Sequence, residues 1–263
     1  MTQLLESKNA IIYGAGGSLG GAVARTFARE GAAVFLAGRH AEPLKAVAAD
    51  VTAAGGTAEV AVVDALDEEA VAAHAADVVA RRGTLDVSFN LITRGDVQGI
   101  PFLDLATADL LAPVATGLAT NFVTARAAAR HMVPQGSGVI LSLTSASSIG
   151  TAPAMGGAGP ADAAIEALMR YLAAEWGPSG VRVVGLWTAG VVESLTDEKI
   201  GAVAGPGAPS AAQVREMLAR AATLRRSPRL EDVAETALFL ASDRAAAVTA
   251  SIVNVTCGLV IPA

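Results

Sequence analysis

The sequence is poor in the residues that build disulfide-stapled or metal-stabilised folds. Its 263 residues include one cysteine, Cys257, and three histidines, His40, His74 and His131. A single cysteine excludes an internal disulfide, and three scattered histidines do not make a zinc ligand set. We therefore expect no metal site, and the low cysteine content is typical of a protein from the reducing cytoplasm.

Long apolar runs and blocks of basic residues are also missing. No stretch of about 18 uncharged apolar residues occurs, so we expect no membrane-spanning helix. The first residues lack the basic region of a signal peptide. Lys and Arg number 19 against 25 Asp and Glu, a formal net charge of −6 without a basic cluster. Nucleic-acid binding is therefore not expected.

Small and aliphatic residues are abundant instead. Hydrophobic residues make up 52% of the chain and aromatic residues only 4%. This composition supports a sizeable core and excludes a mainly disordered chain. The length suits one large domain or two small ones.

Apolar runs alternate with segments of helical spacing along the chain. Strands are predicted over residues 9–13, 33–37, 58–63, 87–92, 139–143, 181–187 and 251–256. Helices are predicted over residues 19–30, 42–54, 67–82, 110–132, 160–176 and 231–241. The alternation predicts an α/β fold, a doubly wound parallel sheet of the Rossmann type in one domain.

Residues 189–227 interrupt this rhythm. They are rich in glycine and proline, and we predict a mobile insertion with one helix near residues 211–222. Segments beyond the carboxyl ends of strands line the ligand crevice of such sheets. The insertion is therefore interpreted as a substrate lid, with an ordinary solvent loop as the alternative.

A glycine-rich loop follows the first predicted strand and opens the first predicted helix. It reads Gly14-Ala15-Gly16-Gly17-Ser18-Leu19-Gly20-Gly21. Glycines allow a tight turn and a close approach to a pyrophosphate, and the helix N-terminus offers free N–H groups. The predicted dinucleotide contacts are Gly14, Gly16, Gly17, Ser18, Leu19 and Gly20. A purely structural turn is the alternative.

The residues after the next two strands indicate which dinucleotide binds. An acid at the end of the second strand would hold the ribose 2′-hydroxyl of NAD, but this chain has Arg39 there, a cation suited to a 2′-phosphate. We predict that the cofactor is NADP(H). The alternative is that Arg39 is an ordinary surface residue. Asp64, which ends the third strand, is predicted either to accept a hydrogen bond from the adenine amino group or to cap the next helix.

At this point the chain resembles the short-chain dehydrogenase/reductase family over nearly its whole length. The loop of residues 13–20 resembles the family's Thr-Gly-x-x-x-Gly-x-Gly, and residues 85–90 resemble the approach to its Asn-Asn-Ala-Gly strand. Residues 139–145 are similar to the strand that ends in its active-site serine. Residues 231–234 and 239–243 match its closing helix.

This resemblance assigns roles to three further residues. It implies that Asn90 contacts the cofactor, that Asn121 bends a helix and holds a water, and that Ser145 is the active-site serine. Family members commonly form tetramers through the long fourth helix, the helix at 160–176 and the last strand. The resemblance therefore implies a homotetramer acting on a small-molecule substrate.

The family's Tyr-x-x-x-Lys pair is replaced in this sequence. Ala158 stands where the tyrosine is expected and Asp162 where the lysine is expected. Alanine cannot donate a proton, so the family's usual route between alcohol and ketone is not available. Asp162 could act as an acid or base if burial raised its pKa, or could simply stabilise the first turn of its helix. Arg94 could anchor an anionic substrate, pair with Asp162 or lie on the surface.

Three functions remain open from the sequence. The first is an NADP(H)-dependent oxidoreductase with an altered acid, which uses Ser145, Asn121 and Asp162 on a carbonyl or activated C=C bond of a small apolar substrate. The second is a non-redox enzyme, such as an isomerase, dehydratase or cyclase. The third is a catalytically silent dinucleotide-binding sensor or partner protein. The retained glycine-rich loop, Arg39, Asn121 and Ser145 favour the first.

Overall fold

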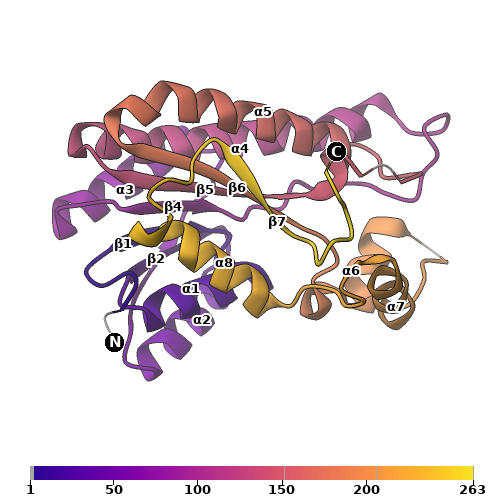
Figure 1. The fold of residues 1–263 in the computed structure, drawn as a ribbon, viewed down its shortest axis with the longest axis horizontal. Helices are drawn as coiled ribbons and strands as arrows, with labels where there is room; N and C mark the ends of the chain where they lie inside the picture. The colour runs from indigo at the N-terminus through magenta and orange to yellow at the C-terminus, as the bar shows by residue number, and fades with distance from the viewer. Residues whose placement is uncertain (1–2, 151, 206, 263) are drawn as a thin grey trace.

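The computed structural model describes residues 3–150, 152–205 and 207–262. In these residues seven parallel strands form one sheet in the order β3-β2-β1-β4-β5-β6-β7 (Figure 1). The strands are β1 Asn9–Tyr13, β2 Ala33–Gly38, β3 Thr57–Val62, β4 Val87–Asn90, β5 Gly138–Ser145, β6 Val181–Thr188 and β7 Ser251–Val255. The predicted doubly wound α/β domain is confirmed.

Helices cover both faces of this sheet. One face carries α1 Ser18–Arg29, α2 Ala41–Ala53 and α8 Leu230–Ala241, and the other carries α3 Glu68–Arg82, α4 Thr107–Gln135 and α5 Ala158–Trp176 (Figure 1). Successive side chains of a strand point to opposite faces. In β1, Ala10 and Ile12 accordingly pack into the first layer, while Ile11 and Tyr13 pack into the second.

Burial differs between the middle and the edges of the sheet. Every residue of β1 and β4 is buried, as expected for strands covered on both faces. The edge strands β3 and β7 contain no fully buried residue. The strands read in the sequence as continuous apolar runs, the pattern of strands buried on both faces. That expectation is wrong for these two, which lie at the edges of the sheet and have a neighbouring strand on one side only.

The segment between β6 and α8 contains more structure than predicted. It includes the short 3₁₀ turn η3 Val192–Ser194 and two helices, α6 Asp197–Ala204 and α7 Ala211–Ala221, which lie together at one end of the sheet (Figure 1). The helix expected near 211–222 is confirmed as α7, but the prediction of a single helix is wrong. Gly201 interrupts the helical pattern of α6 and obscures this helix in the sequence. The sequence does contain a signal for the start of α6, because Thr196 caps it: the Thr196 hydroxyl accepts a hydrogen bond from the Lys199 N–H at 3.2 Å.

Two kinds of structural feature are absent from the described ranges. No helix in them is long and apolar enough to cross a membrane. No group of three or more His, Cys, Asp or Glu side chains in them is arranged to hold a metal ion.

Candidate functional site

The glycine-rich loop lies between β1 and α1, at the carboxyl end of β1, an inner strand of the sheet. Gly14 has a φ of +79°, and a Cβ built on it would lie 2.6 Å from the Leu91 carbonyl oxygen. A Cβ on Gly20 would collide with the Gly14 carbonyl oxygen. These two glycines therefore allow β1, α1 and the chain after β4 to approach one another closely.

The N-terminus of α1 is open to an anion. Gly17 precedes the helix, no side chain of the described residues caps it, and its first turn contains no acidic residue. The first N–H groups of a helix have no partner within the helix and carry its positive dipole end. A phosphate at this position would supply the missing acceptor.

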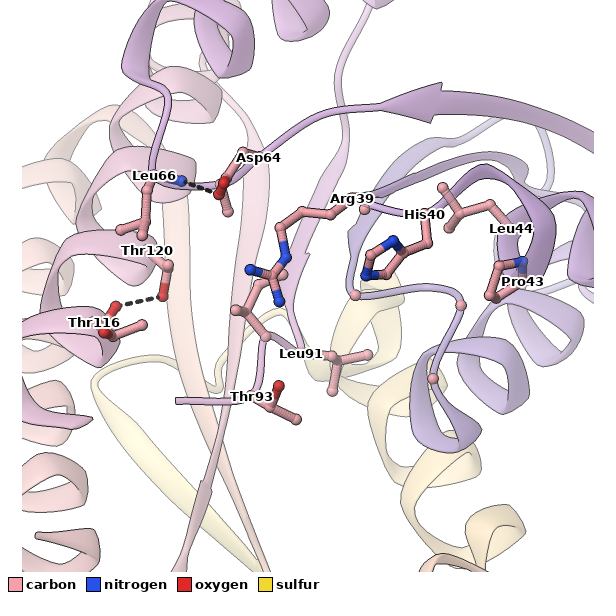
Figure 2. Close-up of a pocket in the computed structure, with 16 residues that line it drawn as sticks. Arg39, His40, Pro43, Leu44, Asp64, Leu66, Leu91, Thr93, Thr116 and Thr120 are labelled. Atoms are coloured by element: carbon pink, nitrogen blue, oxygen red, sulfur yellow. Dashed lines mark hydrogen bonds between the residues drawn. The ribbon is translucent and has the colours of Figure 1, made fainter. Parts of the chain in front are cut away.

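A pocket of about 320 Å³ opens beside the loop, at the carboxyl ends of β1, β2, β3 and β4. Figure 2 shows the Arg39 side chain extending across it, with His40 on one side and Asp64 on the other. The pocket is lined by Gly14, Gly16, Gly17, Gly38, Arg39, His40, Pro43, Leu44, Asp64, Ala65, Leu66, Leu91, Ile92, Thr93, Thr116 and Thr120. Of the predicted cofactor contacts, it brings together Gly14, Gly16, Gly17, Arg39 and Asp64.

Arg39 and Asp64 differ in how much of their hydrogen-bonding capacity is used. Arg39 is exposed and forms no ion pair or side-chain hydrogen bond within the described part of the chain. One Asp64 oxygen accepts the Leu66 N–H at 3.0 Å (Figure 2). The helix-cap alternative for Asp64 is wrong, because Asp67 caps α3 by accepting the Ala70 N–H at 3.0 Å.

Asn90 does not line the pocket but holds in place a residue that does. It is buried at the end of β4, where its amide donates to Thr124 Oγ1 at 3.1 Å and its side-chain oxygen accepts the Ile92 N–H at 3.0 Å. Ile92 lines the pocket and Asn90 does not. The side chain thus fixes the turn that forms one wall.

Asn121 joins α4 to the sheet. Its amide donates to the Gly117 carbonyl one turn earlier, at 2.9 Å, and its side-chain oxygen accepts the Ser142 hydroxyl of β5 at 2.6 Å. The residue is buried, and both groups of its amide are engaged inside the protein. Asn121 therefore positions the crevice wall between α4 and β5.

The clearest chemical constellation lies at the carboxyl end of β5. Ser145 ends this strand and donates from its hydroxyl to Asp162 Oδ2, which also accepts the Ser145 N–H at 3.1 Å. Asp162 Oδ1 forms an ion pair with Arg94, whose guanidinium also bonds Asp96 at 3.1 Å. Asp162 has 0% of its surface exposed. Of the three interpretations of Arg94, pairing with Asp162 is confirmed.

The helix-dipole interpretation of Asp162 is wrong. Helix α5 begins at Ala158, two residues before the predicted start, so its first turn contains no acidic residue. Asp162 lies beyond that turn, and its partners come from β5 and from the loop after β4.

Burial sets the proton affinity of Asp162. Removal from water raises the pKa of its carboxyl group, because the charged form loses its hydration. The Arg94 guanidinium and the Ser145 donors oppose this rise. The net shift is upward and favours the protonated form of this carboxyl group.

Gly117 makes room for Arg94. A Cβ on Gly117 would lie 2.9 Å from Arg94 Cδ and equally close to Ile165 Cδ1. The absence of a side chain at this point of α4 thus lets the arginine cross the helix and reach Asp162. Sequence reasoning missed Gly117, although it lies one helical turn before Asn121.

A second buried carboxylate, also missed, lies one turn further along α5. Glu166 Oε1 accepts from Trp187 Nε1 at 2.7 Å, from the Ser148 hydroxyl at 2.7 Å and from the Thr144 hydroxyl at 3.3 Å. The usable signal was the i, i+4 spacing of Asp162 and Glu166 on an otherwise apolar face. Trp187 is therefore a buried hydrogen-bond donor to this cluster.

Two hydroxyl groups near the end of β6 have no hydrogen-bond partner among the described residues. Thr188 lies beside Ser145 in the parallel register of β5 and β6, and its Oγ1 is buried without a hydrogen bond in the described residues. Ser194 Oγ in η3 is in the same situation, and η3 packs against α1. Buried polar atoms normally find a partner, but these two hydroxyl groups are unsatisfied within the part of the chain that the structure describes.

Comparison with known proteins agrees with this geometry. Residues 14–260 match the family model described as Enoyl-(Acyl carrier protein) reductase. The chain is 31% identical to L-rhamnose 1-dehydrogenase (NAD(P)(+)) of Azotobacter vinelandii, over 97% of this chain and 98% of that protein. It is 29% identical to 7alpha-hydroxysteroid dehydrogenase of Escherichia coli, over 97% of this chain and 94% of that protein.

A solved structure extends the comparison to three dimensions. A 7α-hydroxysteroid dehydrogenase complexed with NADH and 7-oxo glycochenodeoxycholic acid superposes with a TM-score of 0.81 at 26% identity, covering 98% of this chain and 96% of that one. The chain belongs to the short-chain dehydrogenase/reductase family, as its sequence motifs predicted.

Proposed function

We propose that the chain is an NADP(H)-dependent oxidoreductase that transfers hydride to a carbonyl or activated C=C bond of a small apolar substrate. The observation that carries the proposal is the hydrogen bond from Ser145 to the buried carboxyl of Asp162, at the carboxyl end of β5. It supplies a proton-carrying group in a site where Ala158 offers none.

The pocket residues fit a phosphorylated adenine dinucleotide. The N-terminus of α1 and Gly14, Gly16 and Gly17 would hold the pyrophosphate, with Ser18, Leu19 and Gly20 supplying the first helical turn. Arg39 would pair with the 2′-phosphate and Asp64 would accept from the adenine amino group. When bound, the nicotinamide supplies the hydride.

The protein would supply the proton through a short relay. The Ser145 hydroxyl faces two partners, Asp162 and the Ser147 hydroxyl at 2.8 Å. It would donate to the oxyanion that forms on the substrate, and the protonated form of Asp162 would return a proton to it. Asn121 would hold the neighbouring wall in place through Ser142.

The remaining features support a lid and an assembly. Residues 189–227 would cover the substrate end of the crevice, since they begin just after the carboxyl end of β6. Phe122 on α4, Tyr171 on α5 and Ile261 after β7 are exposed apolar side chains on elements through which the family tetramer is expected to form. A homotetramer is therefore part of the proposal.

A substrate panel tests the proposed reaction. The protein is incubated with NADPH and small apolar ketones and enones, and cofactor oxidation is followed by absorbance. We expect oxidation with at least one of them and a large loss of rate in Ser145→Ala. Tight NADPH binding without any turnover would favour the silent sensor, and product formation without cofactor would favour a non-redox enzyme.

Arg39→Ala tests the cofactor choice. Loss of charge-assisted hydrogen bonds to a 2′-phosphate is expected to weaken NADPH binding by about 10- to 100-fold. NADH lacks that phosphate, so its dissociation constant should stay unchanged and serves as the internal control. Both constants are measured by nicotinamide fluorescence. A preference for NADPH that survives the substitution would refute the role given to Arg39.

A further inference from the structure

Lys199 reaches the glycine-rich loop from a distant part of the chain. It lies on α6, and its Nζ donates to the hydroxyl of Ser18, the first residue of α1, at 3.3 Å. The two residues are 181 positions apart in the sequence. Helix α6 therefore places an ammonium group at the N-terminus of α1.

The Lys199 ammonium group has no acidic partner in the part of the chain that the structure describes. Lys199 is exposed and forms no ion pair within residues 3–150, 152–205 and 207–262, and its side chain bonds only the neutral Ser18 hydroxyl there. Of the acids beside it, Asp197 accepts the Ala211 N–H at 2.6 Å and so joins α6 to α7. A cation and a positive helix end lie together, which favours an anion that contacts both.

The other end of α6 holds the helix in place. The Val203 carbonyl accepts the Gln98 N–H at 3.1 Å, and Gly99, with a φ of +84°, lies so close that a Cβ would be 3.0 Å from the Ala204 carbonyl oxygen. Helix α6 thus bridges the glycine-rich loop and the loop that follows β4. Lys199 is held over the loop by contacts at both ends of its helix.

We propose that Lys199 is a ligand of the dinucleotide pyrophosphate, delivered by the lid segment. The inference rests on the proposed dinucleotide-binding function and adds a second, separate phosphate contact to it. Arg39 lies in the pocket at the end of β2, whereas Lys199 lies at Ser18. The two cations therefore serve different phosphates, and binding of the cofactor would hold α6 against α1.

Substitution of Lys199 by glutamine separates these roles. NADPH and NADH both contain the pyrophosphate. Lys199→Gln is therefore expected to weaken the binding of both dinucleotides by the same factor, about 3- to 30-fold. Adenosine 2′-monophosphate has no pyrophosphate, so its affinity, measured by competition, should not change. Arg220→Gln is the matched control, because Arg220 is an exposed lid cation that pairs with Glu216 on its own helix.

Each outcome decides the inference. Equal weakening of NADPH and NADH in Lys199→Gln, with Arg220→Gln unchanged, supports it. Unchanged dinucleotide binding in Lys199→Gln, or weakening of NADPH alone, overturns it while leaving the proposed function intact. Failure of the unsubstituted protein to bind either dinucleotide overturns the proposed function and this inference together.

Discussion

Asp162→Asn is expected to lower kcat by about 10²–10⁴-fold, the usual contribution of a general acid. Asparagine has nearly the same shape and can still accept from Ser145 through its carbonyl oxygen, but it cannot supply a proton. Dissociation constants for NADPH should stay within about twofold, since Asp162 is not part of the dinucleotide pocket. The measurement is steady-state turnover of the substrate found in the panel, beside an NADPH titration.

The pH profile gives this prediction a second readout. If protonated Asp162 is the acid, reduction slows as pH rises through its upward-shifted pKa, because the deprotonated form cannot donate. The profile should become flat in Asp162→Asn. Glu166→Gln is the control, since it makes the same chemical change one turn further along α5. Full turnover in Asp162→Asn would show that the proton comes from elsewhere.

Arg94→Ala is expected to lower the free energy of unfolding by roughly 3–5 kcal/mol, because it leaves a buried carboxylate without its cation. Asp162 is fully buried, and the Arg94 side chain is 13% exposed. Arg25→Ala is the control, since Arg25 and Asp50 form an ion pair with both side chains near half exposure. Such a pair is expected to contribute only about 0–1 kcal/mol. Urea unfolding measures both.

The loss in Arg94→Ala should depend on pH. Without Arg94, burial raises the pKa of Asp162 above its value in the unfolded chain, about 3.9. Below that value the carboxyl is protonated in both states and little stability is lost. As pH rises above that value the unfolded state gives up the proton first, so the deficit grows until the carboxyl group of the folded variant ionises as well. A deficit independent of pH, or one that Asp162→Asn fails to relieve in the double variant, would contradict the account.

The fold was predictable because its signals are local. Apolar runs bounded by glycines predict strands, and the regular spacing between them predicts helices on both faces of a parallel sheet. Helix α6 escaped prediction because Gly201 lies in its middle, where glycine is unfavourable. Strands β3 and β7 are partly exposed because they lie at the two edges of the sheet. The order of the strands in the sheet could not be predicted from the sequence pattern.

The site was predictable as a set of residues but not as a network. Ser145, Asp162 and Arg94 were each identified as candidates, yet a two-residue error in the start of α5 placed Asp162 in a first turn where its dipole interpretation looked sound. Gly117 and Glu166 were missed because their roles depend on contacts between elements: Gly117 accommodates Arg94, and Glu166 binds Trp187. Such contacts arise only once α4, α5 and the sheet are packed.

The central claim is that the pocket beside the glycine-rich loop binds a phosphorylated nicotinamide dinucleotide although Ala158 and Asp162 replace the expected tyrosine and lysine. Isothermal titration calorimetry of the purified protein with NADPH, and separately with NADH, tests it most directly. We expect saturable heat with a stoichiometry of one per chain and at least tenfold tighter binding of NADPH, about 1.4 kcal/mol. No heat of binding with either dinucleotide would contradict the claim.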